Sequence, residues 1–108
     1  ITNESDIRLK KNIEDSNINA LNQIERLEFI EYEWDKDKRP HAPDGKQFGI
    51  KAQYAPFLQT KSADEDSYLS IDMNKHVNFN SKAIQELHEE NKQLRKELDE
   101  IKQLLKGD

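Results

Sequence analysis

The sequence contains no cysteine, only three glycines and three prolines, and 7% aromatic residues. Small proteins are usually supported by disulfides, by a metal or by association of identical copies, and the absence of cysteine excludes the first of these. Only 33% of the 108 residues are hydrophobic, so one copy can bury one modest core at best. We therefore expect a single folding unit that associates with copies of itself.

Long apolar stretches and an excess of basic charge are also missing. No uninterrupted apolar run approaches the roughly 20 residues that cross a bilayer, so we expect no membrane partner. The net charge is -5, and the lysines and arginines are interspersed with acidic residues. A protein that neutralises phosphates needs basic residues clustered on one face, so we expect no nucleic-acid partner either.

The most regular pattern lies near the C-terminal end of the sequence. Apolar residues there recur at alternating spacings of three and four, which is the a/d pattern of a heptad coiled coil. Glu90 and Glu97 at g positions each stand five residues before an oppositely charged e residue, Arg95 or Lys102, which favours parallel helices. The heptads alone leave dimer and trimer open. The expected interface consists of Ile84, Leu87, Asn91, Leu94, Leu98, Ile101 and Leu105.

The residues before the heptads predict short elements of both kinds. Residues 20–27 carry apolar side chains at helical spacing, and Asn17 or Ser16 can cap this helix. The period then changes to two over residues 30–34, which predicts a half-buried strand. A polar run rich in turn formers follows over residues 36–45 and predicts a loop.

A second strand is predicted over residues 48–52, and the loop before it suits an antiparallel return. We expect a solvated loop over residues 61–67 and a last short strand over residues 68–72, with Asp72 capping the long terminal helix. The predicted fold class is α+β, with a short N-terminal helix, a small antiparallel sheet and a long C-terminal helix that forms a parallel coiled coil.

The run from Ser5 to Ile13 reads Ser-Asp-Ile-Arg-Leu-Lys-Lys-Asn-Ile. It resembles the pattern Ser-Asp-x-Arg-x-Lys-x-Asn-Ile that opens the intramolecular chaperone domains of bacteriophage tail spikes, tail fibres and neck appendages. Residues 49–53 read Gly-Ile-Lys-Ala-Gln and are similar to the family's Gly-x-Ile-Ala-Gln, although Lys51 replaces a usually apolar residue. The resemblance also includes the aromatic strand ending at Trp34 before this motif, and Leu69-Ser70-Ile71-Asp72 and the closing coiled coil after it, in the family's order. The supporting motif residues are Asp6, Arg8, Asn12, Gly49 and Gln53.

This resemblance implies a homotrimer that templates the folding of the preceding tail spike or tail fibre segment of the same polypeptide and then cuts itself off. It implies that Ser5 is the nucleophile, that Lys10 is the general base, and that the bond between Glu4 and Ser5 is cleaved. It also implies assembly in the host cytoplasm and a parent protein in the virion tail. The expected parts are residues 1–4 before the cleaved bond, a chaperone head over residues 5–72 and a trimerisation helix over residues 73–108.

Serine–lysine chemistry makes physical demands on such a pair. A serine hydroxyl attacks only when a base removes its proton, and a neutral lysine amine can serve without histidine. Lowering a lysine pKa from about 10.4 to about 7–8 takes ~3–5 kcal/mol, which burial in an assembled trimer could supply. Cleavage would then wait for assembly. Without the surrounding motif, Ser5 would be interpreted as a helix cap before a solvated basic turn.

The spacing of Ser5 and Lys10 restricts how the two side chains can meet. Five positions along a helix place side chains about 140° apart, and along a strand they face opposite sides. Either the chain bends between them, or Lys10 of one chain serves Ser5 of a neighbour. The simplest route is an N-to-O acyl shift that forms an ester, which water then hydrolyses.

Other candidates are weaker. His41, His76 and His88 are scattered along the sequence without ligand spacing, so we expect no metal and no cofactor. Two alternative functions remain: a trimerisation module that does not cleave, and a plain coiled-coil interaction protein with a small hairpin head.

Overall fold

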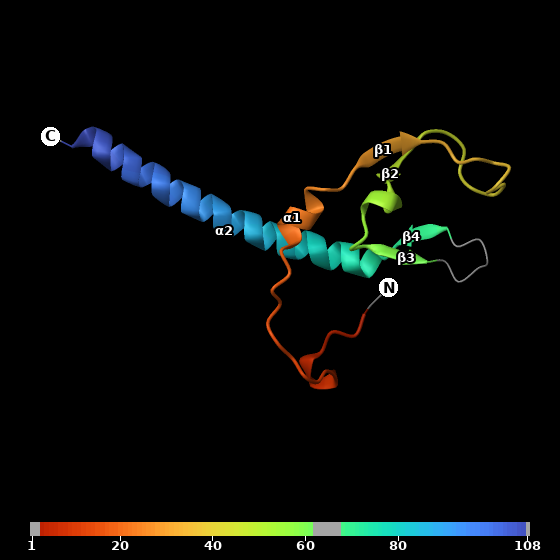
Figure 1. Cartoon of the computed structure of the whole chain (residues 1–108), viewed down its shortest axis with the longest axis horizontal. Helices are drawn as coiled ribbons and strands as arrows, with labels where there is room; N and C mark the ends of the chain where they lie inside the picture. The colour runs from red at the N-terminus through yellow and green to blue at the C-terminus, as the bar shows by residue number, and fades with distance from the viewer. Residues whose placement is uncertain (1–2, 62–67, 108) are drawn as a thin grey trace.

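The computed structural model describes residues 3–61 and 68–107. Its elements confirm the predicted α+β class (Figure 1). Within the described residues, no helix has both the length and the apolar character needed to cross a membrane. In chain order the elements are the 3-10 helix η1 (Ile7–Leu9), α1 (Ala20–Ile24), β1 (Phe29–Tyr32), β2 (Gln47–Ile50), the 3-10 helix η2 (Ala52–Tyr54), β3 (Gln59–Lys61), β4 (Leu69–Ile71) and α2 (Met73–Lys106).

Helix α1 is shorter than the predicted helix and has a different cap. Its N-cap is Asn19, whose side chain accepts a hydrogen bond from the N–H of Asn22 at 3.2 Å. The prediction of Asn17 or Ser16 as the cap is therefore wrong. Asn19 stands directly before the first helical residue, where an asparagine side chain can reach the free amides of the first turn.

Strands β1 and β2 form the predicted antiparallel hairpin, but β1 ends at Tyr32, so the prediction that the strand extends to Trp34 is wrong. Phe29 pairs with Ile50 and Glu31 pairs with Phe48, so these four side chains share one face of the sheet. The rings of Phe29 and Phe48 stack on that face, with centroids 5.6 Å apart. The predicted second strand is wrong at its end, because β2 stops at Ile50 and Ala52 lies in η2.

A second hairpin follows in which only one strand was predicted. β4 confirms the last short strand, and β3 pairs with it so that Gln59 lies opposite Ile71. The structure thus has two separate two-stranded sheets. Of the loop predicted over residues 61–67, Lys61 belongs to β3 and residues 62–67 lie outside the described residues.

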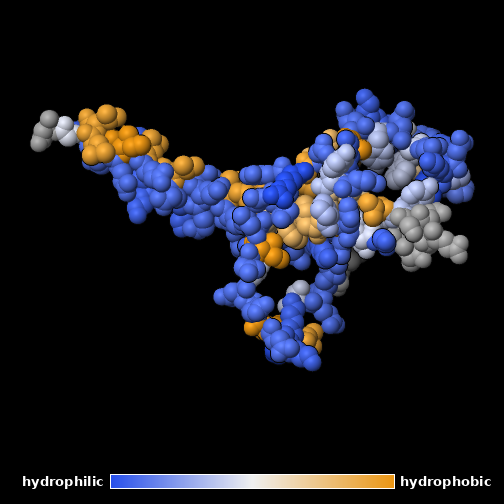
Figure 2. Space-filling model, viewed as in Figure 1, coloured by the Kyte–Doolittle hydropathy of each residue, from blue (hydrophilic) through white to orange (hydrophobic). Residues whose placement is uncertain are grey.

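Helix α2 begins where the sequence predicts. Asp72 caps it by accepting a hydrogen bond from the N–H of Lys75 at 3.1 Å. The heptad residues lie along α2 with exposed side chains, 60% for Leu94 and 50% for Leu98. Figure 2 shows hydrophobic surface along the outer half of this helix.

The core lies where α1 and the segment after η2 meet the first part of α2 (Figure 1). The rings of Phe57 and Phe79 join these parts, with centroids 4.8 Å apart. Asp72 donates its N–H to the carbonyl of Leu58 at 2.8 Å, which ties the same segment to the start of α2. The buried hydrophobic residues in the described chain are Ala20, Ala55, Leu58 and Ala83.

The single chain is far more extended than a compact protein of its size. Its longest dimension is 73 Å and its radius of gyration is 20.6 Å, against about 13 Å for a compact chain of this length. It exposes 9740 Å² of surface, whereas a compact monomer of this mass exposes about 6,200 Å². A chain with this excess of surface has a large area available for association.

Candidate functional site

The residues of the predicted cleavage motif lie in an arm that leaves the rest of the chain. Residues 3–19, here called the motif arm, run from near the start of α2, turn at η1 and return to α1 (Figure 1). Apolar side chains on this arm are exposed, 63% for Ile7, 67% for Leu9 and 58% for Ile13. The arm therefore presents the motif together with uncovered apolar surface.

Asp6 and Arg8 form the turn between the two predicted catalytic residues. Asp6 caps η1 by accepting a hydrogen bond from the N–H of Arg8 at 2.9 Å. Its carboxylate also pairs with the Arg8 guanidinium, with 2.7 Å between Oδ2 and Nη2. The side-chain hydrogen bonds from Arg8, followed by its backbone N–H, lower the pKa of Asp6 from its ordinary value. These two motif residues thus stabilise a local bend.

Ser5 and Lys10 lie on the two sides of this bend. Ser5 precedes the cap residue, and Lys10 ends η1 by donating its N–H to the carbonyl of Ile7 at 3.1 Å. Both residues are exposed, and among the described residues no hydrogen bond joins their side chains. The structure has the bend that a pair within one chain requires, and it also leaves both side chains accessible to a second chain.

Asn12 ends the turn with an unusual backbone conformation. Its φ is 55°, in the left-handed region that asparagine enters more readily than most residues with a side chain. The arm changes direction at this residue. An asparagine at this motif position therefore has a conformational reason.

The second motif lies on the hairpin and not on the arm. A Cβ atom at Gly49 would lie 3.3 Å from Cε1 of Tyr32, so glycine allows the tyrosine ring to cross β2. Gln53 lies in η2 with an exposed side chain. In the described part of the chain, no hydrogen bond connects either residue with Ser5 or Lys10.

Lys51, which stands where the family usually has an apolar residue, is accommodated at the end of β2. Its N–H donates to the carbonyl of Glu28 at 3.1 Å, and its Nζ lies 5.3 Å from the ring centroid of Tyr54. Because Lys51 lies beyond the last paired residue of β2, its side chain does not enter the sheet.

Two groups of polar residues on α2, which the sequence analysis missed, hold the ends of the motif arm. At the outer end, Nδ2 of Asn3 donates a hydrogen bond to Oδ1 of Asn74 at 2.8 Å. Asn3 stands just before Glu4, the residue whose carbonyl would be attacked. Asn74 lies in the first turn of α2.

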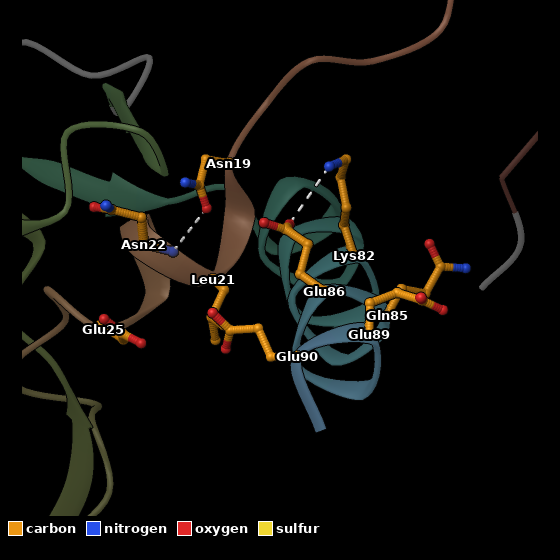
Figure 3. A pocket seen from close by; sticks show the side chains of 9 residues that line it. All are labelled: Asn19, Leu21, Asn22, Glu25, Lys82, Gln85, Glu86, Glu89 and Glu90. Carbon is orange, nitrogen blue, oxygen red and sulfur yellow. Dashed lines mark hydrogen bonds and ion pairs between the residues drawn. The ribbon is translucent and has the colours of Figure 1, made fainter. Parts of the chain in front are cut away.

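At the inner end, Lys82 and Glu86 bind the backbone on either side of Asn19. The ammonium group of Lys82 donates to the carbonyl of Ile18, and the carboxylate of Glu86 accepts from the N–H of Ala20 at 2.9 Å. Lys82 and Glu86 also pair with each other at 3.4 Å (Figure 3). No sequence signal marks these residues, because their partners are backbone groups more than 60 positions away.

The contacts of Glu86 change its ionisation. Partial desolvation raises the pKa of the carboxyl group, but the N–H groups of Ala20 and Leu21 and the ammonium group of Lys82 together outweigh it and leave the pKa lowered. Glu86 therefore favours its charged form, which is the better hydrogen-bond acceptor.

The described residues contain no group of His, Cys, Asp and Glu that could hold a metal ion. No curated protein matches the chain. The Peptidase_S74 family, whose description is chaperone of endosialidase, matches residues 5–56. This match begins at Ser5 and includes the motif arm from that residue onward, the first hairpin and the second motif. The match over residues 5–56 agrees with the family that the order of the motifs predicted.

Proposed function

We propose that this chain is a trimeric intramolecular chaperone that aligns the tail spike or tail fibre segment preceding it and then releases itself by cleaving the bond between Glu4 and Ser5. The observation that carries the proposal is the family match that begins at Ser5. The η1 bend between Ser5 and Lys10 supports the catalytic part.

Association is supported by the distribution of contacts around α2. The heptad stripe is exposed, while α1 and the motif arm contact Lys82 and Glu86, which occupy f and c positions of the same heptad register. These positions face away from an a/d seam. Three α2 helices can therefore pack along the stripe without displacing α1.

The chemistry follows from the proposed pair. Lys10 accepts the proton of the Ser5 hydroxyl group, and the freed oxygen attacks the carbonyl carbon of Glu4. The bond from that carbon to the Ser5 nitrogen breaks as the nitrogen takes the proton, which leaves an ester and a free amine. Water then hydrolyses the ester, so the products are a Glu4 carboxylate and a domain that begins with Ser5.

Cleavage after assembly would allow the domain to align the chains first and to be removed afterwards. Fibrous β-trimers pair strands that are distant in sequence or on different chains, so chain alignment is slow and error-prone. A trimeric domain that aligns the chains first removes this step. Its later release in the host cytoplasm leaves a virion-tail trimer that persists because its unfolding is slow.

The test is mass spectrometry of the chain fused to its native upstream segment, compared with the Ser5→Ala and Lys10→Ala variants. Lys11→Ala is the matched control, because it removes an adjacent lysine from the same arm. We expect the natural fusion and the control to split between Glu4 and Ser5, and the other two variants to stay whole as trimers. An uncut natural fusion that still forms trimers would contradict the proposed peptidase activity.

A second candidate, a trimerisation module that does not cleave, is favoured by one observation. Within the described residues, the exposed Ser5 and Lys10 side chains share no hydrogen bond. The same fusion separates the two functions, because this module would form trimers and stay intact in all four proteins.

A further inference from the structure

The motif arm is attached to α2 at both of its ends, by residues that the proposed chemistry does not use. We infer that Asn74 and the Lys82–Glu86 pair are positioning residues, which hold the two ends of the arm so that the scissile bond and its serine are presented in a fixed geometry. This inference rests on the proposed self-cleavage and adds residues of α2 to the machinery that controls it.

The outer attachment lies on the far side of the scissile bond from Ser5. Asn3 is the second residue before Ser5, and its side-chain amide donates to Asn74 at 2.8 Å. Asn74 therefore holds the segment that leaves when the bond is cut. Because Asn74 belongs to the first turn of a helix with a side-chain cap, its backbone position is well defined.

The inner attachment supplies one donor and one acceptor to the backbone. Lys82 donates to the carbonyl of Ile18 while Glu86 accepts from the N–H of Ala20. The two side chains are only 33% and 25% exposed, and they pair with each other. A partly shielded pair that serves two backbone groups fixes both the position and the direction of the chain at this point.

The distances explain why an arm of this kind needs two attachments. Eight positions separate Asn74 from Lys82, which corresponds to about 12 Å along α2. The 15 positions from Asn3 to Ile18 could span roughly 50 Å when extended. A segment that is so much longer than the distance between its attachments samples many conformations unless both ends are held. The attachments restrict the arm to excursions that begin and end on α2.

The same arrangement links cleavage to assembly. In the heptad register, Lys82 and Glu86 lie outside the a/d stripe, so packing of α2 helices leaves their contacts with the arm in place. Once three helices associate, each arm has a fixed position relative to its neighbours. An arm that had lost its attachments would keep Ser5 and Lys10 but would present them in many orientations.

The test uses the full chain fused to its native upstream segment. The double variant Lys82→Glu with Glu86→Lys keeps an ion pair at i and i+4, in the order that helices prefer, but it reverses donor and acceptor toward the arm. Lys82→Arg preserves the donor. For the outer end, Asn74→Ala is compared with Asn80→Ala, which removes an exposed asparagine from the same helix.

We expect the double variant and Asn74→Ala to cleave at least ~10-fold more slowly than the natural fusion. Loss of the fixed reacting geometry lowers the rate of the chemical step by at least about tenfold. Both should remain trimeric by mass, and amide exchange over residues 3–20 should be faster. Lys82→Arg and Asn80→Ala should cleave at nearly the natural rate. If any change in α2 slowed cleavage by disturbing the fold, these two variants would be slowed as well.

Cleavage of both variants at the natural rate would overturn the inference and leave the proposed function intact. Loss of trimers in the double variant would also overturn it for the inner attachment, since the pair would then support folding. If the natural fusion itself stays uncut, the proposed peptidase fails and this inference fails with it.

Discussion

Asn12 is the residue at which the motif arm changes direction, and its φ of 55° limits what can replace it. Glycine enters the left-handed region freely, whereas a β-branched residue is strained there by ~1–2 kcal/mol. We expect Asn12→Gly to cleave at close to the natural rate and Asn12→Val to cleave roughly 5- to 30-fold more slowly. Time courses of the fusion by mass spectrometry measure this. Equal rates for the two variants would show that the left-handed turn is not required.

Gly49 matters because of the tyrosine ring that lies across it. A methyl group there would lie 3.3 Å from Tyr32 Cε1, so Gly49→Ala must displace the ring. We expect a loss of about 1 kcal/mol in the free energy of unfolding, measured with urea. In a Tyr32→Ala background the same change should have little or no destabilising effect. A loss of equal size in both backgrounds would mean that the ring is not the cause.

Individual residues were predictable from the sequence where the signal is local. Asp72 was identified as a helix cap because the cap and the helix are adjacent in the sequence. Asn19 was missed as the cap of α1 because Ser16, Asn17 and Asn19 are all good caps, and tertiary contacts of Ala20 select among them. The attachments at Lys82 and Glu86 could not be predicted, because they join a side chain to distant backbone groups.

At the scale of elements, the docking of α1 on α2 depends on the charge of Glu86. The folded-state pKa of this carboxyl group lies below its ordinary value of 4.5. A lowered folded pKa gives stability that is present above the unfolded pKa and is lost as pH falls through the folded pKa. Lys82 faces Glu86 with opposite charge, and the same pocket is lined by the like-charged residues Glu25, Glu89 and Glu90 (Figure 3).

We therefore expect the natural chain to lose stability as pH falls from about 5 toward 3, and the Glu86→Gln variant to lose less over this range. The variant keeps an acceptor oxygen for Ala20 but has no charge to titrate. Urea unfolding of both proteins at several pH values measures the difference. Parallel pH profiles would show that ionisation of Glu86 does not stabilise the docked α1.

Elements were predictable in proportion to the length of their periodic signal. Helix α2 extends over many repeats, and its start was predicted correctly. Strand β3 has only the three residues Gln59–Lys61, two of them exposed, so no alternation could mark it. The division into two sheets follows from the pairing of β3 with β4. Which strands pair depends on tertiary contacts, and the residue pattern of a single strand does not predict it.

At the scale of the whole molecule, the excess surface and the exposed heptad stripe predict that the isolated chain is not the stable form. Introducing charge into the stripe with Leu94→Asp and Leu98→Asp should convert the proposed trimers to smaller species, because buried unpaired carboxylates are strongly unfavourable. Sedimentation measures the mass. The control Lys96→Asp changes charge at an outward-facing f position and should stay trimeric. Dissociation of the control as well would point to net charge as the cause.

In the proposed cleavage, Ser5 is served by Lys10 either of its own chain or of a neighbour. The motif arm extends away from its own chain, and its exposed Ile7, Leu9 and Ile13 offer apolar surface that a neighbouring chain could cover (Figure 1). We therefore expect catalysis between chains. In trimers assembled from equal amounts of Ser5→Ala and Lys10→Ala fusions, each Lys10→Ala chain retains its serine and can borrow a neighbour's lysine. Up to about half of these chains should be cut, since in a cyclic trimer only one neighbour faces the serine.

Mass tags on the two fusions distinguish the two chains, so that the shortened chain can be identified. Only the Lys10→Ala chain should be shortened. The Ser5→Ala chain lacks a nucleophile in either arrangement and serves as the internal control. If the natural fusion cleaves but every chain of the mixed trimers stays whole, the pair acts within one chain. The η1 bend formed by Asp6 and Arg8 would then have to bring Ser5 and Lys10 together by closing further on assembly.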